Sequence, residues 1–71
     1  MRANAKLTKT ICKRIKKYRH ERGLTQEDLA EKVGASRVYI GYVEQGRNTP
    51  SLEILEKIAK VLKVKLSDLV D

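Results

Sequence analysis

The segment from Gln26 to Gln45 constrains the fold of this chain more than any other. Apolar residues recur at helical spacing on both sides of Gly34: Leu29, Ala30, Val33, Ile40 and Val43. Thr25 and Ser36 stand where a side-chain oxygen can cap the helix that follows, and Thr25 has an acid, Asp28, three residues on. A glycine often supplies the left-handed residue that ends a helix. We therefore predict two short helices joined by a tight glycine turn.

The second of these helices, residues 36–45, has an outward face that folding alone does not explain. At about 100° per residue, Ile40, Val43 and Glu44 turn inward, and the outward residues are Val38, Gly41, Tyr42 and Gln45. A glycine in mid-helix costs about 1 kcal/mol relative to alanine, and an exposed valine or tyrosine gains nothing from burial. Scattered apolar surface residues are common. The other interpretation is a face shaped to enter a groove.

Positive charge is concentrated at the N-terminal end. The chain carries a net charge of +7, and residues 1–22 hold nine Lys/Arg against Glu21 alone, which gives 9 − 1 = +8. The remainder holds seven bases and eight acids, or 7 − 8 = −1. Such a concentration is the electrostatic signature of a polyanion partner. A solvated helix face is the alternative, and an anionic membrane is disfavoured because residues 10–22 expose few bulky apolar side chains.

Length and composition exclude several classes of protein. The 71 residues make one small domain, with no stretch of about 18 apolar residues and no signal-peptide core, so we expect a cytoplasmic protein. Cys12 is the sole cysteine and His20 the sole histidine. They cannot form an internal disulfide or a patterned zinc site, and we expect a reduced, partly buried thiol and a solvated imidazole. No catalytic set is visible, so neither an enzyme nor a cofactor is expected.

The N-terminal part of the chain divides near residue 10. Residues 1–9 lack periodicity and predict a basic, mobile arm, followed by one domain over residues 10–71. The first helix is expected to start near Thr8 or Thr10, either of which could cap it, and to end at Gly23.

The C-terminal part predicts two further helices. We expect Thr49 to cap a helix with Pro50 in its first turn, running to about Leu62. Its apolar residues cover roughly 180°, more than a core requires, which suggests a partner surface. A short, poorly capped helix over residues 66–70 completes an all-α chain.

The motifs resemble those of one family. The sequence reads R-x-x-x-G-L-T-Q-E-D-L-A from Arg19 to Ala30, then V-G-A-S, I-G-Y-V-E-Q-G, P-S-L-E and L-S-D-L. From Ile11 to Leu69 the chain resembles the Cro/CI-type (XRE-like) helix-turn-helix domains of phage repressors and their bacterial and archaeal relatives. R-V-Y-I-G also resembles the controller proteins of restriction–modification systems. The resemblance implies a compact bundle of five short helices, a lambda-repressor-like DNA-binding domain.

The resemblance further implies sequence-specific binding of double-stranded DNA, with the helix at residues 36–45 in the major groove. There Arg37 could pair with O6 and N7 of a guanine, Val38 could pack on a thymine methyl, and Tyr42 could meet a base edge or sugar. The expected phosphate-contacting residues are Gln26, Ser36, Tyr39, Arg47, Asn48 and Arg19.

Two kinds of protein contact also follow from the resemblance. Arg19 and Glu44 should form an ion pair between the first and third helices. A homodimer on a pseudo-palindromic operator is expected, with candidate interface residues Val64, Leu66, Leu69 and Val70.

Regulation is the expected outcome of binding, as a repressor or a controller. Acids at Glu27, Asp28 and Glu31 match those with which related repressors that also activate touch RNA polymerase, although acids near a helix N-terminus also favour its dipole. The alternative is an antitoxin or another protein-interaction module built on a DNA-binding fold.

Overall fold

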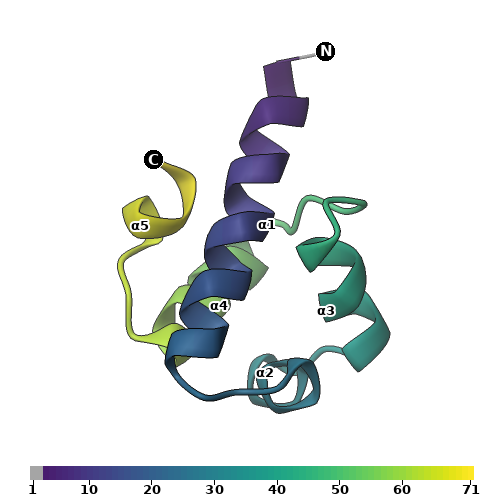
Figure 1. The fold of residues 1–71 in the computed structure, drawn as a ribbon, viewed down its shortest axis with the longest axis vertical. Helices are drawn as coiled ribbons and strands as arrows, with labels where there is room; N and C mark the ends of the chain where they lie inside the picture. Colours follow the sequence, from purple (N-terminus) through teal and green to yellow (C-terminus); the bar gives the residue numbers. More distant parts are fainter. Residues whose placement is uncertain (1–2) are drawn as a thin grey trace.

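The structure, a computed structural model, describes residues 3–71, and Figure 1 shows their arrangement. Five helices follow one another: α1 (Ala3–Glu21), α2 (Gln26–Val33), α3 (Arg37–Glu44), α4 (Leu52–Leu62) and α5 (Leu66–Val70). Residues 3–71 contain no strand, so the expected all-α bundle of five helices is confirmed. None of these helices has both the length and the apolar character needed to cross a membrane.

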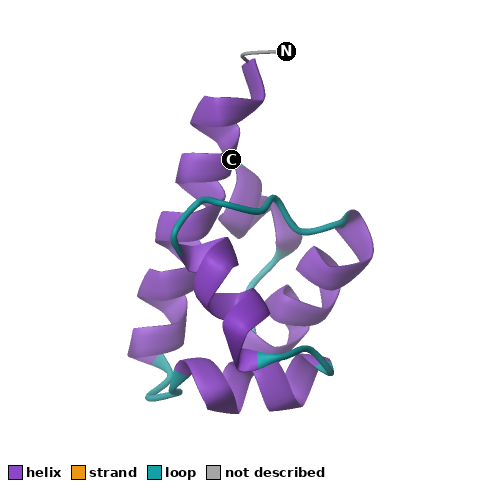
Figure 2. Ribbon diagram, turned by 90° about the vertical axis from the view of Figure 1, so that its right-hand side faces the viewer, coloured by secondary structure: helices purple, strands orange, loops and turns teal. Residues whose placement is uncertain are grey.

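The core lies where all five helices meet. Its largest fully buried side chains are Ile11, Ile15, Leu29, Ile40, Ile58, Leu62, Leu69 and Val43. The long helix α1 packs against α3, α4 and α5, and α2 packs against α3 and α4. Figure 2 shows α3 at the front of the domain with α1 alongside it and α2 crossing below. One side of α3 is thus fixed to the core and the other is free.

The turn between α2 and α3 has the geometry that the sequence predicts. Thr25 Oγ1 accepts a hydrogen bond from the Asp28 N–H at 3.0 Å, and Asp28 Oδ2 accepts one from the Thr25 N–H at 2.9 Å. Gly34 ends α2 in the left-handed region at φ +79°. Ser36 Oγ then accepts from the Tyr39 N–H at 3.0 Å and caps α3. These caps set the angle at which α3 leaves α2.

Helix α1 begins earlier than expected. It starts at Ala3 and not at Thr8 or Thr10, so residues 3–9, expected as a mobile arm, are helical. No glycine or proline interrupts residues 3–10. Neither threonine caps the helix: Thr10 Oγ1 bonds back to the Lys6 carbonyl at 3.1 Å, and Thr8 Oγ1 lies 2.6 Å from Thr49 Oγ1. Residues 1–2 of the expected arm lie outside the described residues.

The start of α4 also differs from expectation. The cap is Ser51 and not Thr49, because Ser51 Oγ accepts from the Ile54 N–H at 3.2 Å. Pro50 is buried and precedes the cap instead of occupying the first turn. The helix ends at Leu62, as expected, and Lys63 turns the chain at φ +60°.

Helix α5 is held by bonds at its two ends. At its start Asp68 Oδ2 accepts from the Lys65 N–H at 2.9 Å. At its end Arg14 of α1 donates to the carbonyls of Asp68 and Asp71 at 3.2 and 3.0 Å. These bonds compensate for the weak cap that the sequence indicates.

Candidate nucleic-acid interface

Helix α3 has one buried side and one exposed side. Ile40 and Val43 are fully buried, and Glu44 is nearly so. Val38 and Tyr42 are 57% and 40% exposed, although both are large apolar residues. Arg37 and Gln45 are exposed beside them. The helix therefore presents an apolar and aromatic strip with an arginine at its first position.

Contacts with neighbouring residues organise this face. The position of a Cβ on Gly41 would lie 3.7 Å from Gln26 Oε1, which puts the start of α2 directly beside the middle of α3. At the other end, the Arg47 guanidinium lies over the Tyr42 ring, 5.5 Å from its centroid. Arg47, from the loop after α3, and Tyr42 of α3 thus form one stacked pair.

Arg19 and Glu44 meet beneath this surface. Arg19 Nε and Nη2 donate to Glu44 Oε2 and Oε1 at 2.6 and 3.0 Å, a two-pronged pair. Gln26 Nε2 donates to the same Oε1 at 3.0 Å. Both charged side chains are more than nine-tenths buried. One carboxylate therefore connects the ends of α1, α2 and α3.

Arg19 has little hydrogen-bonding capacity left. Its Nη1 donates to the Leu24 carbonyl at 2.8 Å, and its Nη2 lies 3.4 Å from His20 Nε2. With the two bonds to Glu44, four of the five guanidinium N–H groups are engaged. A phosphate that approached Arg19 would have to use the remaining N–H or displace the imidazole.

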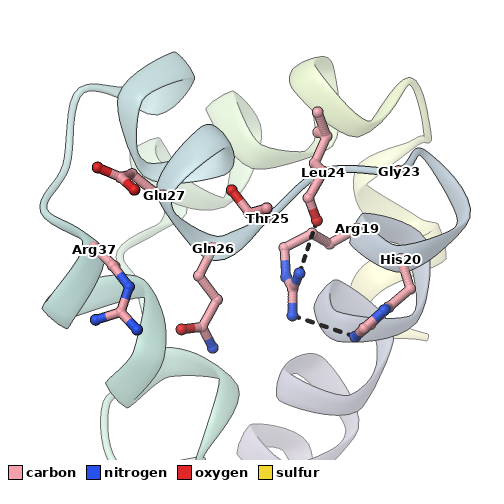
Figure 3. Close-up of a pocket in the computed structure, with 8 residues that line it drawn as sticks. All are labelled: Arg19, His20, Gly23, Leu24, Thr25, Gln26, Glu27 and Arg37. Carbon is pink, nitrogen blue, oxygen red and sulfur yellow. Dashed lines mark hydrogen bonds between the residues drawn. The ribbon is translucent and has the colours of Figure 1, made fainter.

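A pocket of about 440 Å³ opens at the start of α2. Figure 3 shows that Arg37, Gln26, Arg19 and His20 reach into it from three helices. The other lining residues are Gly23, Leu24, Thr25 and Glu27. Polarised N–H groups at a helix start and convergent cationic side chains suit an anionic group. His20, which we expected to be merely solvated, belongs to this site, and only its position next to Arg19 could have indicated this.

The remaining predicted phosphate-contacting residues lie around the same face. Asn48 and Ser36 are exposed and Tyr39 is half-buried. Because Ser36 Oγ is already used as the α3 cap, its free capacity is limited.

The residues predicted for a dimer interface do not all reach the surface. Val64, Leu66 and Val70 are half-buried, but Leu69 is fully buried in the core of its own chain. In the single chain Leu69 thus offers no exposed surface to a partner, because its side chain belongs to the hydrophobic core. Leu52, which is 61% exposed, is an apolar residue more exposed than any of these four.

Together, the capped α2–turn–α3 unit, the exposed face of α3 and the cationic pocket define a helix-turn-helix DNA-binding domain. Comparison with known proteins supports this class. The helix-turn-helix family model HTH_3 matches residues 15–69. The chain therefore belongs to this helix-turn-helix family, and the resemblance to its Cro/CI-type members is confirmed.

Individual relatives agree with this assignment. An HTH-type transcriptional regulator of Archaeoglobus fulgidus is 45% identical over 56 residues, 79% of this chain and 80% of that protein. SinR, a master regulator of biofilm formation whose structure was solved in complex with DNA, is 40% identical with a TM-score of 0.81, over 86% of this chain and 98% of the SinR chain in that structure. The restriction–modification controller C.AhdI of Aeromonas hydrophila is 34% identical with a TM-score of 0.83, over 87% and 94% of the two chains.

Proposed function

We propose that this protein is a transcriptional regulator that binds a specific sequence in double-stranded DNA by placing α3 in the major groove. The observation that carries this proposal is the exposed face of α3. Val38 and Tyr42 stand in solvent next to Arg37, on a helix whose opposite side is fully buried. A groove about 12 Å wide admits such a helix.

Base reading falls to the three residues on this face. Arg37, in the first turn, can donate two N–H groups to O6 and N7 of a guanine. Val38 can pack on the methyl group of a thymine, and Tyr42 can meet a base edge or a sugar. Gly41 lies between them without a side chain, which allows close approach of the helix to the bases.

Phosphate contacts would set the position of α3 in the groove. On one side the pocket at the start of α2 offers Gln26 and the helix N-terminus, with Arg19 behind them. On the other side the loop after α3 offers Arg47 and Asn48. Ser36 and Tyr39 complete the set at the start of α3.

We further propose that the protein binds as a homodimer on a pseudo-palindromic site, with half-sites about one helical turn apart. Val64, Leu66 and Val70 are the candidate contacts, to which the exposed Leu52 can be added. Sedimentation equilibrium should detect a dimer, either free or on a duplex with two half-sites. A monomer under both conditions would remove this part of the proposal.

Contact with RNA polymerase is proposed through the acids of α2. Glu27 and Glu31 are exposed, whereas the carboxylate of Asp28 is engaged by the Thr25 N–H. The first two are therefore the available contacts. The alternative of a protein-interaction module is not favoured, since the relatives named above are transcriptional regulators.

Selection of bound duplexes from a random DNA pool tests the proposed function. We expect enrichment of a two-fold related motif that contains a guanine opposite Arg37. Selection that enriches no motif, from protein shown to be folded, would refute sequence-specific binding.

A further inference from the structure

Three lysines on α1 form a row that the domain itself does not use. Lys9, Lys13 and Lys16, followed by His20, have the spacing i, i+4, i+7, i+11. At about 100° per residue they lie within roughly 60° of one another, so they share one stripe of the helix. All four side chains are exposed. In the described chain the one ion pair within 4.0 Å joins Arg19 and Glu44, so no carboxylate pairs with this lysine row.

Two other cations of α1, Arg14 and Lys17, and Arg22 just after the helix, have partners within the domain. Arg14 donates to carbonyls at the end of α5, and Arg22 Nε donates to the Leu62 carbonyl at the end of α4, at 2.7 Å. Lys17 lies over the ring of Tyr18, 5.3 Å from its centroid. These cations stabilise the fold. The lysine row instead concentrates like charges along one stripe, which is unfavourable unless an external anion meets them.

The stripe lies next to the seam between α1 and α3. That seam is marked by Arg19, which is bonded to Glu44, and by Cys12, whose Sγ lies 3.7 Å from the position of a Cβ on Gly46. Viewed down the axis of α1, the lysine row lies directly beside Cys12 and Arg19. Arg14, which contacts α5, lies on the other side of these two residues.

The C-terminal end of the row is fixed on the DNA-reading side of the domain. His20 lines the pocket that Gln26 and Arg37 also line, as Figure 3 shows. In Figure 2, α1 runs alongside α3 from the turn before α2 toward the loop that follows α3. The lysine row therefore flanks the recognition helix over much of its length.

We propose that the lysine row binds the phosphate backbone of the DNA strand that borders the major groove on the α1 side, extending the contact that begins at Gln26. This inference rests on the proposed function. From Lys9 to His20 the helix rises about 16 Å, enough to follow several consecutive phosphates. Lysine binds phosphate as a point charge without reading sequence. The row should therefore add affinity and salt dependence without changing the selected motif.

The test compares two double variants with equal loss of charge. Lys13→Gln/Lys16→Gln removes two members of the row, and the control Lys57→Gln/Lys60→Gln removes two exposed lysines of α4. Affinity is measured on a selected duplex and on a random duplex over a salt series, with circular dichroism to verify folding. Loss of two phosphate contacts should lower the slope of log affinity against log salt by about 1.8 units.

The expected results separate this inference from the proposed function. Between about 50 and 200 mM salt the row variant should lose roughly 12-fold less affinity than the wild type, on both duplexes, and the control should match the wild type. Equal slopes for wild type, row variant and control would overturn the inference while specific binding by the wild type stands. Absence of specific binding by the wild type would refute the proposed function itself.

An anionic membrane surface is the other polyanion that such a row could meet. Co-sedimentation with phosphatidylserine vesicles tests it on the same proteins. Loss of vesicle binding in the row variant, without any change in the DNA salt slope, would assign the row to lipid and overturn the inference. We expect no row-dependent vesicle binding, because the row carries no bulky apolar side chains to insert.

Discussion

Substitution of Glu44 by alanine should be among the most destabilising changes in this protein. The carboxylate accepts three hydrogen bonds, two from Arg19 and one from Gln26, at 2.6 to 3.0 Å. Its removal leaves a guanidinium that is only 7% exposed without its counter-ion. Breaking a buried pair in this way costs about 3–5 kcal/mol. A domain of this length has a free energy of unfolding of roughly 4–11 kcal/mol, so the variant should be close to unfolding.

The matched control and the double variant make this reasoning testable in urea unfolding followed by circular dichroism. Glu56→Ala, an exposed acid on α4, should change the free energy of unfolding by about 0.5 kcal/mol or less. Arg19→Met/Glu44→Leu replaces both charges with apolar groups, and should be more stable than Glu44→Ala alone. If Glu44→Ala unfolds at the same urea concentration as Glu56→Ala, the buried pair does not have the importance given to it here.

Three further predictions concern single positions. Gly41→Ala should raise the free energy of unfolding by about 1 kcal/mol, since the added Cβ meets nothing closer than 3.7 Å, and urea unfolding measures this effect. The same methyl group should weaken specific DNA binding, because it projects from the face of α3 that enters the groove, and titration with the selected duplex measures that effect. The hydrogen bond from the Thr25 N–H lowers the pKa of Asp28, so the ionised carboxylate stabilises the fold above its unfolded pKa, and this stabilisation is lost as pH falls through the folded pKa. Asp28→Asn should therefore have a lower melting temperature than the wild type at pH 7 and the same melting temperature in acid. A difference in melting temperature that persists in acid would contradict a stabilisation that depends on the ionised carboxylate. Glu31→Gln should leave DNA affinity intact, because Glu31 lies outside the pocket at the start of α2, but it should reduce activation in a reporter assay. Unchanged promoter output would contradict the proposed polymerase contact.

The sequence predicted the centre of the fold better than its ends. The unit from Thr25 to Val43 was predictable because its caps, glycine turn and apolar spacing are all local, and each agrees with the others. The start of α1 was missed because Thr8 and Thr10 look like caps, whereas Thr10 bonds back to the Lys6 carbonyl within the helix and Thr8 lies against Thr49 of a distant loop. Local sequence does not specify which polar side chain a distant loop will meet.

The site was predictable to a similar degree. Exposure of Val38 and Tyr42 follows from the helical period alone. The burial of Leu69 and the place of His20 in the pocket do not, because both depend on how α1 packs against other helices. The stacking of Arg47 on Tyr42 likewise depends on the path of the loop after α3.

The most direct test of the account is the ratio of specific to random DNA affinity in Arg37→Ala, at one stated salt concentration. If Arg37 reads a guanine, the variant should lose about 1–3 kcal/mol on the selected duplex, relax preference at one base pair and bind random duplex as before. Lys9→Ala, from the lysine row of α1, is the control, and should weaken both duplexes alike with a salt slope lower by about one unit. Equal weakening of both duplexes by Arg37→Ala, with the selected motif unchanged, would contradict the account and make Arg37 a phosphate contact.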